Sequence, residues 1–310
     1  MKSSVLDAKH FHDEEAAYAY LEARVWPEGP ICPRCGQHPR ISKMGGKSTR
    51  IGVYKCYQCR KPFRVTVGTV FESSHVPLRL WLQCIHLMAS SKKGISSNQL
   101  SRTLGVQLKT AWFMSHRVRE AMRVLGMEPM GGEGKIVESD ETYIGRVEGM
   151  PKARAGGGHK NAVLTLVERG GSARSFHLDN MKMEQIAPLV LKNVLRESHL
   201  MTDEGRHYKA IGTQFSAHDA VRHSIGEYVR YREDDGPVIH SNTVENYYSI
   251  FKRGMKGVYQ HCKEKHLHRY LAEFDFRYSN RVALGVNDVA RADRALKGIV
   301  GKRLTYRTPH

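Results

Sequence analysis

The sequence has few acidic residues. Its 310 residues contain 31 Asp and Glu against 49 Lys and Arg, which leaves a formal net charge of +18 at pH 7. This imbalance excludes an acidic disordered protein and predicts a polyanionic partner, because basic surfaces attract phosphates and release their counterions. The excess is uneven, since residues 251–310 hold 14 Lys and Arg but 5 Asp and Glu. We therefore expect a partner that is a nucleic acid.

Long apolar runs and abundant cysteines are also lacking. No stretch reaches the ~18 apolar residues that a membrane span needs, and the start of the chain shows no apolar core of signal-peptide length. Six cysteines in 310 residues are too few for a secreted disulfide scaffold. These absences predict a cytoplasmic protein. The length is sufficient for two or three domains, each with a core of its own.

Four of the six cysteines form two Cys-x-x-Cys pairs. Cys32 and Cys35 make the first pair and Cys56 and Cys59 the second, with 20 residues between the pairs. Each pair can direct two thiolates at one metal ion, and two pairs complete a tetrahedral zinc site. A redox Cys-x-x-Cys, the alternative, needs one pair in a thioredoxin-like βαβ context, which is lacking here. We predict one structural Zn²⁺, because four thiolates leave no ligand position for a reacting water.

This site defines the first predicted domain, a zinc ribbon over residues 1–72 with a short N-terminal helix. Residues 51–55 and 63–67 have the composition of short strands. A helical segment follows at 73–130, where Pro77 suits a first helical turn and apolar residues recur at helical spacing.

Within that segment, the sequence matches a helix-turn-helix. A short helix capped at Ser97, a turn at Gly105 and a second helix over about residues 109–123 make up the pattern. Similar patterns occur in ordinary helical bundles. If the segment binds DNA, the second helix is the one expected to enter a groove. The side chains that we expect it to offer are Lys109, Thr110, Arg117 and Arg119.

The pattern changes to strands after residues 131–134, a glycine-rich stretch that we expect to be a linker. The β-rich runs are 135–144, 161–167, 174–178, 198–202 and 227–232. An amphipathic helix over 183–195 and a long helix from about Asn242 accompany them. The order β-β-β-α-β-(α)-β-α predicts an α/β fold for residues 131–285, an RNase H-like core with a mixed sheet flanked by helices. A basic tail, 286–310, would follow it.

Three acidic residues fall where such a core would place metal ligands. Asp140 lies in the first strand, Asp203 at the carboxyl end of the fourth strand, and Glu245 in the first turns of the last helix. Carboxylate oxygens suit Mg²⁺, and two ions about 4 Å apart can assist phosphodiester displacement. Glu138 shares the face of Asp140 by period two. The alternative is that these are ordinary solvated carboxylates, as most of the 31 must be.

Several motifs resemble those of a known family. They are CPRCG with CYQC, SDETYIGR, MTDEGRHY and a long motif that begins HSNTVENYYSIFKRG. Over about residues 10–285 the chain resembles the ISXO-like insertion-sequence transposases, bacterial DDE enzymes with an N-terminal zinc ribbon. The resemblance implies that Asp140, Asp203 and Glu245 form the catalytic triad and bind two Mg²⁺ or Mn²⁺ ions. It also implies a nucleoid-associated protein that works on transposon ends and target DNA as a homodimer or higher oligomer.

Residues around Glu245 extend this expectation. Lys252, seven residues later, fits the basic residue of the family pattern, and with Arg253 it suits the DNA backbone. Asn242 shares a helical face with Glu245, so both could line the site. We favour Glu245 as the third ligand because a carboxylate binds Mg²⁺ more strongly and because Lys252 is in register with it. The resemblance also suggests a contact of His240 with the region of the scissile phosphate.

The function that the resemblance implies is DNA transposition. Such an enzyme binds the terminal inverted repeats of its element, cuts the DNA to expose a 3′-OH and joins that hydroxyl to target DNA. Two alternatives remain open. One is a non-catalytic DNA-binding regulator derived from a transposase, although such a chain has no physical reason to keep three clustered carboxylates. The other is an RNase H-like nuclease that cuts without joining.

Overall fold

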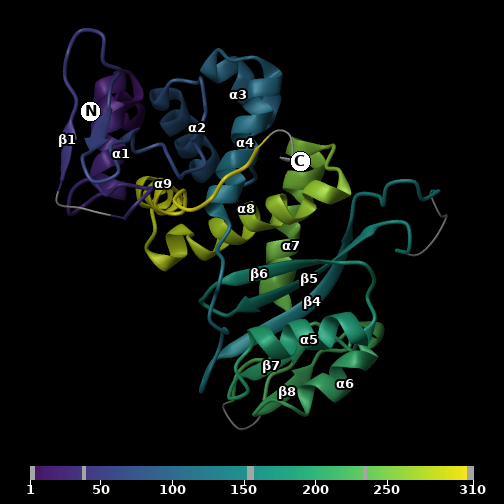
Figure 1. Ribbon diagram of the computed structural model, residues 1–310. Coiled ribbons are helices and arrows are strands. Elements are labelled where there is room, and N and C mark those ends of the chain that lie inside the picture. The colour runs from purple at the N-terminus through teal and green to yellow at the C-terminus, as the bar shows by residue number, and fades with distance from the viewer. Residues whose placement is uncertain (1–3, 37–39, 152–156, 233–235, 306–310) are drawn as a thin grey trace. The chain divides into compact units, whose positions relative to one another are not determined.

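The chain divides into two compact units (Figure 1). The computed structural model describes residues 4–36, 40–151, 157–232 and 236–305. The described residues of Met1–Arg123 and Val286–His310 form one unit, and those of Val124–Gly285 form the other. Within these ranges, none of the helices has the length and apolar character needed to cross a bilayer.

The first unit begins with α1 (Glu14–Val25) and a small three-stranded antiparallel sheet. The strands are β1 (Ile41–Lys43), β2 (Tyr54–Cys56) and β3 (Pro62–Phe63), in that spatial order. Two of the three strands overlap the expected positions, but both are shorter than expected. β1 was not predicted, since three residues are too few for a recognisable alternation of apolar and polar side chains.

The described part of this unit also contains the α-helices α2 (Leu78–Ser90), α3 (Ser97–Leu104), α4 (Leu108–Met122) and α9 (Asp288–Lys297), and two short 3-10 helices, Val5–Asp7 and Lys9–Phe11. The bounds of α3 and α4 lie within a residue of those expected. Ser96 rather than Ser97 caps α3, because its Oγ accepts the backbone N–H of Gln99 at 3.1 Å. Gly105 ends α3 with a φ of 65°, a left-handed conformation that glycine adopts without strain.

The C-terminal helix α9 packs against α1, α2 and α4. Arg24 of α1 donates two hydrogen bonds to the Asp293 carboxylate, at 2.7 and 3.3 Å, and the Tyr20 hydroxyl donates a third at 2.8 Å. The buried residues of α9 are Arg291, Ala292, Ala295 and Leu296. We expected residues 286–310 to be a basic tail, but α9 is part of the core of the first unit.

The second unit is built on a five-stranded mixed sheet in the order β6-β5-β4-β7-β8 (Figure 1). The strands are β4 (Ile136–Ile144), β5 (Asn161–Glu168), β6 (Ala173–Leu178), β7 (His199–Thr202) and β8 (Ala217–Ala220). β4, β5 and β6 are antiparallel neighbours, whereas β4, β7 and β8 are parallel. The predicted RNase H-like class is confirmed.

One predicted strand of this sheet was wrong. Residues 227–232 are rich in Tyr and Val, as a strand often is, yet they contribute only an isolated bridge between Arg230 and Ile239. The fifth strand is β8 instead, whose residues Ala-His-Asp-Ala are half-buried. A short edge strand without β-branched residues carries no local signal, because its pairing with β7 is what defines it.

Helices cover both faces of the sheet. α5 (Met183–Asn193) and α6 (Arg206–Gly212) share an apolar core with Leu164 and Leu166 of β5. α7 (Asn242–Gly254) and α8 (Leu267–Ser279) share the opposite core with Val163 and Val167. Successive residues of β5 therefore face different helices, which explains why apolar residues predominate between Ala162 and Val167.

The glycine-rich segment before β4 lies within the second unit, and is not the expected linker between domains. Gly131 has a φ of 88°, and a Cβ added to it would lie 2.1 Å from the Ser198 Oγ. The Gly132 N–H donates to the same Oγ at 2.8 Å. The chain passes from one unit to the other at Arg123–Val124, seven residues before the expected boundary.

Candidate functional site

The register of two parallel strands brings Asp140 beside Asp203. Glu138 of β4 pairs with Met201 of β7, so the same register two residues further on reaches Asp140 and Asp203. β7 ends at Thr202, and Asp203 therefore leaves the sheet next to the middle of β4. The two carboxylates are close enough for the charge of Asp203 to raise the pKa of Asp140.

The helix α7 brings Glu245 to the same region. At its start, the Glu138 carboxylate accepts the backbone N–H of Thr243 at 2.8 Å and the Thr243 hydroxyl at 2.7 Å, which caps the helix from β4. One turn later, the Tyr248 hydroxyl donates to the backbone carbonyl of Asp140 at 2.6 Å. Glu245 lies between these anchors, and its charge also acts on Asp140.

Glu138 is fully buried and is paired with a cation. Arg169 donates to its Oε1 at 2.6 Å and to the backbone carbonyl of His240 at 2.9 Å. The His240 Nδ1 lies 3.3 Å from Glu138 and accepts the backbone N–H of Asn242 at 3.2 Å. Burial and the charge of Arg169 lower the pKa of His240, in agreement with this acceptor role. His240 thus lies in the network that holds the start of α7.

Burial, together with repulsion between carboxylates, shapes the electrostatics of the region. Burial and the charges of Glu141, Asp203 and Glu245 raise the pKa of Asp140 to about 7. Burial also raises the pKa of Asp203, although a hydrogen bond from the Gly205 N–H opposes this. The donor set consists of oxygens, and a bound divalent cation would relieve the repulsion, so these residues fit Mg²⁺ or Mn²⁺.

The carboxylate oxygens are more widely spaced than the ligands of a closed site. Across the described ranges, the only group of three or more His, Cys, Asp or Glu ligand atoms within 4.8 Å of one another is formed by four cysteines. Glu245 is also held from outside the group. Its Oε1 accepts the Ser241 hydroxyl at 2.9 Å and lies 3.4 Å from the His223 Nε2.

Glu141 was not among the predicted site residues. It accepts a hydrogen bond from the Tyr208 hydroxyl and lies 3.2 Å from the His207 Nε2, and this contact raises the pKa of His207. Strand alternation directs Glu141 away from the Asp140 face, so the period-two argument gave no reason to select it. Its charge nevertheless raises the pKa of both Asp140 and Asp203. In the sequence, only the position of Glu141 directly after Asp140 could have indicated that it belongs to the site.

The basic residues of α7 differ in their surroundings. Lys252 is half-buried, with its Nζ 5.8 Å from the centre of the Tyr248 ring. Burial lowers the pKa of Lys252, and the charge of Asp140 opposes this effect. Arg253 is exposed in the last turn of the helix. Lys252 therefore places a cation within electrostatic reach of Asp140.

The four predicted DNA-contacting residues of α4 divide into two pairs. Lys109 is exposed and Thr110 is half-buried in the first turn. Arg117 and Arg119 are 6% and 1% exposed, so the structure does not support DNA contacts for them. Their guanidinium groups instead donate to acceptors inside the first unit, namely the carbonyls of Glu72 and Leu304 and the Ser115 hydroxyl. The sequence shows their charge but not the segments that pack over them.

The four predicted zinc ligands converge. The Sγ atoms of Cys32 and Cys59 are 3.7 Å apart, those of Cys35 and Cys56 are 3.6 Å apart, and all four lie within 4.8 Å of one another. Zn–S bonds of ~2.3 Å in a tetrahedron give S–S distances of about 3.8 Å. Burial raises the pKa of the Cys32 thiol, but backbone N–H groups, including that of Arg34, outweigh it and lower the pKa to about 7. The cluster fits structural zinc.

An RNase H-like sheet with carboxylates gathered beside its central strand, joined to a four-cysteine ribbon, defines the class of DDE transposases that carry a zinc ribbon. Residues 131–279 match the ISXO2-like transposase domain, and residues 12–62 match the transposase zinc-ribbon domain. The chain belongs to this ISXO2-like transposase family, and the resemblance seen in its motifs is confirmed.

A relative has a similar length. The chain is 28% identical over 289 residues to an uncharacterized protein in the transposable element ISH50 of Halobacterium salinarum. The alignment covers 88% of this chain and 93% of the relative. The similarity therefore extends over both units.

Proposed function

We propose that this protein is the transposase of an insertion sequence: it binds the terminal inverted repeats, cuts the DNA there and joins the free 3′-OH to target DNA. The observation that carries the proposal is the electrostatic coupling of Asp140 to Asp203 and Glu245, three residues from distant parts of the chain. Membership of the transposase family supports the same reading.

In this proposal Asp140, Asp203 and Glu245 hold two Mg²⁺ or Mn²⁺ ions, with Asn242 as the alternative third ligand. When bound, such ions activate the attacking oxygen and stabilise the leaving oxygen of a phosphodiester displacement. Lys252 contributes a fixed cation that orients a phosphate beside Asp140. Both steps are displacements at phosphorus. Water enters and the 3′ oxygen leaves in the cut, and that 3′-OH displaces a target oxygen in the joining step.

Recognition of the ends belongs to the first unit in this proposal. The ribbon and the α3–α4 pair contact the inverted repeats, and Lys109 and Thr110 are the accessible members of the predicted set on α4. Lys252 and Arg253 contact the DNA backbone near the cut. Because two ends must be paired, the working assembly is at least a dimer, and it acts on chromosomal DNA.

The test is a strand-transfer assay with a duplex that carries the end of the element. We expect the unaltered full chain to cut the duplex and to join it to a plasmid in the presence of Mg²⁺. Asp203→Asn abolishes both steps because a neutral amide replaces a charged carboxylate that binds Mg²⁺ more strongly, and it leaves end binding nearly unchanged. The matched control is Asp179→Asn, which alters an exposed carboxylate of the same unit and retains activity.

The same assay separates the alternatives. Cutting without joining by the parent protein would favour a nuclease, and binding without cutting would favour a regulator. Full strand transfer by Asp203→Asn would refute the proposed ligand set.

A further inference from the structure

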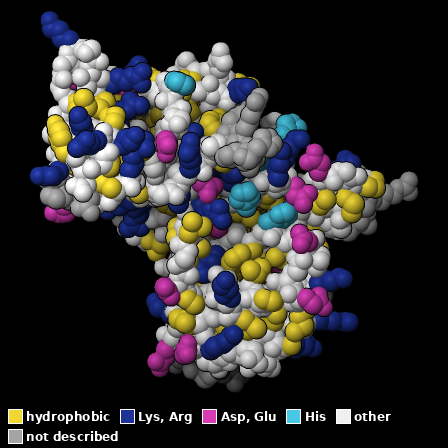
Figure 2. Space-filling view, in the orientation of Figure 1, with side chains coloured by type: hydrophobic (Ala, Val, Ile, Leu, Met, Phe, Trp, Pro, Cys, Tyr) yellow, Lys and Arg dark blue, Asp and Glu magenta, His cyan; other side chains and the backbone are white. Residues whose placement is uncertain are grey.

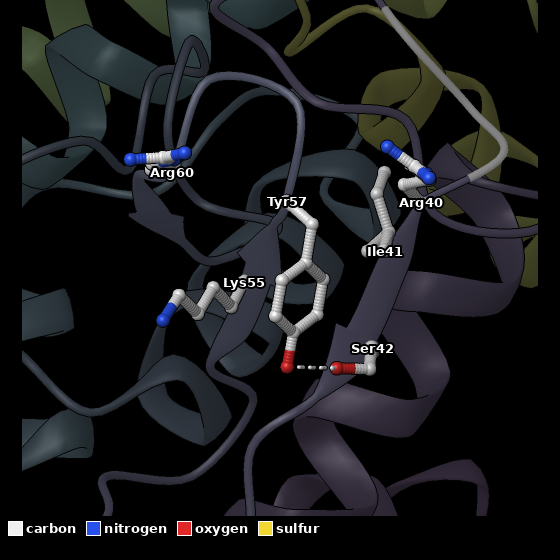
Figure 3. A pocket seen from close by; sticks show the side chains of 6 residues that line it. All are labelled: Arg40, Ile41, Ser42, Lys55, Tyr57 and Arg60. Carbon is white, nitrogen blue, oxygen red and sulfur yellow. Dashed lines mark hydrogen bonds between the residues drawn. The ribbon is translucent and has the colours of Figure 1, made fainter.

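A cationic groove lies on the sheet of the ribbon (Figure 3). It has a volume of about 620 Å³, and the residues that line it are Arg40, Ile41, Ser42, Lys55, Tyr57 and Arg60. Three of the six are cations and none is acidic. Figure 3 shows the Tyr57 ring between the side chains of Lys55 and Ile41, with its hydroxyl directed at Ser42.

Strand alternation separates this groove from the ribbon core. Ser42 pairs with Lys55 across β1 and β2, and the Tyr57 N–H donates to the Arg40 carbonyl at 2.8 Å, which continues the same ladder. Residues two apart share a face, so all four side chains point to one side of the sheet. The intervening Cys56 is buried in the cluster on the other side. The cysteine cluster thus lies on one side of the sheet and these four side chains lie on the other, while Ile41, which pairs with Cys56, packs against the cluster and also lines the groove.

The metal ligands fix the position of the groove. Lys55 and Tyr57 flank Cys56, and Arg60 follows Cys59 directly. Arg60 has a φ of 57°, a conformation that costs free energy for a residue with a Cβ. Arg60 therefore places a long cationic side chain at a position whose backbone conformation glycine adopts more easily.

The charged residues of the ribbon segment 40–61 are all cationic. Residues 40–61 contain no Asp or Glu and seven cations: Arg40, Lys43, Lys47, Arg50, Lys55, Arg60 and Lys61. Figure 2 likewise shows more Lys and Arg than Asp and Glu over the part of the surface that belongs to this unit. Such a local field attracts polyanions and disfavours cationic or apolar partners.

The groove is also shallow. Arg40, Ser42 and Arg60 are exposed, and Tyr57 is 53% exposed. An enclosed pocket for a small molecule buries most of its ligand, which this surface cannot do. Ser42 donates to the Tyr57 oxygen at 3.4 Å, which leaves the phenolic proton for an outside acceptor. Cations beside an outward hydroxyl suit a row of phosphate oxygens.

We propose that this groove binds the sugar-phosphate backbone of duplex DNA at the transposon end, with Arg40, Lys55 and Arg60 on phosphates and Tyr57 as a hydrogen-bond donor. The inference rests on the proposed function, because it takes the element's own end as the ligand. The inference specifies which face of the ribbon contacts DNA. The contact positions the DNA through its backbone and does not read the bases.

The experiment measures binding of the full chain to a fluorescent duplex of the element's end over a series of KCl concentrations. Replacement of Arg40, Lys55 and Arg60 by Ala removes three phosphate contacts. The slope of log K against log salt should fall by roughly 2.7, and affinity near ~0.1 M salt by roughly 10²–10³-fold. Lys47→Ala is the matched control, an exposed ribbon cation outside the groove. Zinc content equal to the parent's verifies that each variant is folded.

Three results would overturn the inference. One is a triple variant that keeps the parent slope. Another is a Lys47→Ala effect as large as that of each groove substitution, which indicates a diffuse field. The third is tighter binding of single strands with Tyr57→Ala as the most damaging change, which indicates base stacking. Any of these three results would leave strand transfer by the parent protein unaffected. The proposed function would fail in a different way, namely if the parent protein bound DNA but did not cut it.

Discussion

Glu138 and Asp140 lie two residues apart on one face of β4, yet their environments differ. Glu138 is fully buried, and its charge is met by Arg169 and by the first N–H groups of α7. Burial and neighbouring acids instead raise the pKa of Asp140 to about 7. A carboxylate whose acceptors are all satisfied suits a structural role, whereas one surrounded by like charges suits a cation site.

At this scale we predict that Glu138→Gln lowers the free energy of unfolding by ~3 kcal/mol, because it removes the buried counter-charge of the half-buried Arg169. The start of α7 should also loosen, and strand transfer should decrease because Glu245 moves. Urea denaturation and the strand-transfer assay measure the two effects. Glu133→Gln, an exposed change nearby, serves as the control. Unchanged stability of Glu138→Gln would contradict the assigned role.

The folding of the ribbon depends on the metal that its four cysteines can bind. Its buried cluster holds little besides Cys32, Cys56 and Phe63, with Trp26 packed beside them. So small a core supplies little free energy of folding, and metal binding must supply the rest.

We therefore predict that Cys32→Ser loses bound zinc, and with it the specific binding of element ends. Metal analysis and a binding titration with end and scrambled duplexes measure both. Cys84→Ser, a buried cysteine outside the cluster, is the control and keeps its zinc. A zinc content equal to the parent's in Cys32→Ser would show that the ligand assignment is wrong.

The contact of α9 with α1 gives a pH-dependent prediction. Burial raises the pKa of Asp293, but hydrogen bonds from Arg24 and Tyr20 outweigh it, so the pKa lies below its ordinary value of 3.8. A lowered pKa of an acid stabilises the folded state above the unfolded-state pKa, and the gain is lost as the pH falls through the folded-state pKa.

Asp293→Asn should thus lower the free energy of unfolding by about 1 kcal/mol at pH 6, a value limited by partial solvent exposure. The difference from the parent should stay constant down to about pH 4 and shrink below it. Denaturant unfolding at several pH values measures this. Glu15→Gln, which changes an exposed carboxylate of α1, gives the reference. A difference that grows on acidification would contradict the assigned pKa direction.

At the scale of the whole molecule, the described residues near both ends of the chain belong to one unit, and the RNase H-like unit is inserted between them. Leu296 and Ile299 are buried there, although almost 300 residues separate them from the N-terminus. The first unit therefore cannot complete its core until the rest of the chain has been synthesised.

Removal of residues 286–310 should lower the Tm of the first unit by roughly 10 °C or more, because it exposes apolar surface of α1, α2 and α4. The fragment 124–285, whose sheet and both helical layers are complete, should fold cooperatively without the other unit. Calorimetry of the truncated chain and of the fragment measures both expectations. A truncated chain with the parent's Tm would contradict the role given to α9.

Local patterns predicted much of this protein. Two Cys-x-x-Cys pairs indicated the metal cluster, and short β-rich runs marked the positions of β4, β5, β6 and β7, so the RNase H-like order could be predicted. The motifs around Asp140, Asp203 and Glu245 indicated the family. These features could be found because each depends on residues close together in the chain.

The remaining features depend on residues far apart. β8 is a strand because β7 pairs with it, α9 joins the first unit because its apolar face meets α1 and α2, and Arg117 is buried because the segment near Leu304 packs over it. The network of Glu138, Arg169 and His240 likewise joins β4 to α7 across about 100 residues. No local periodicity reports such contacts, since their free energy arises only when the chain has folded.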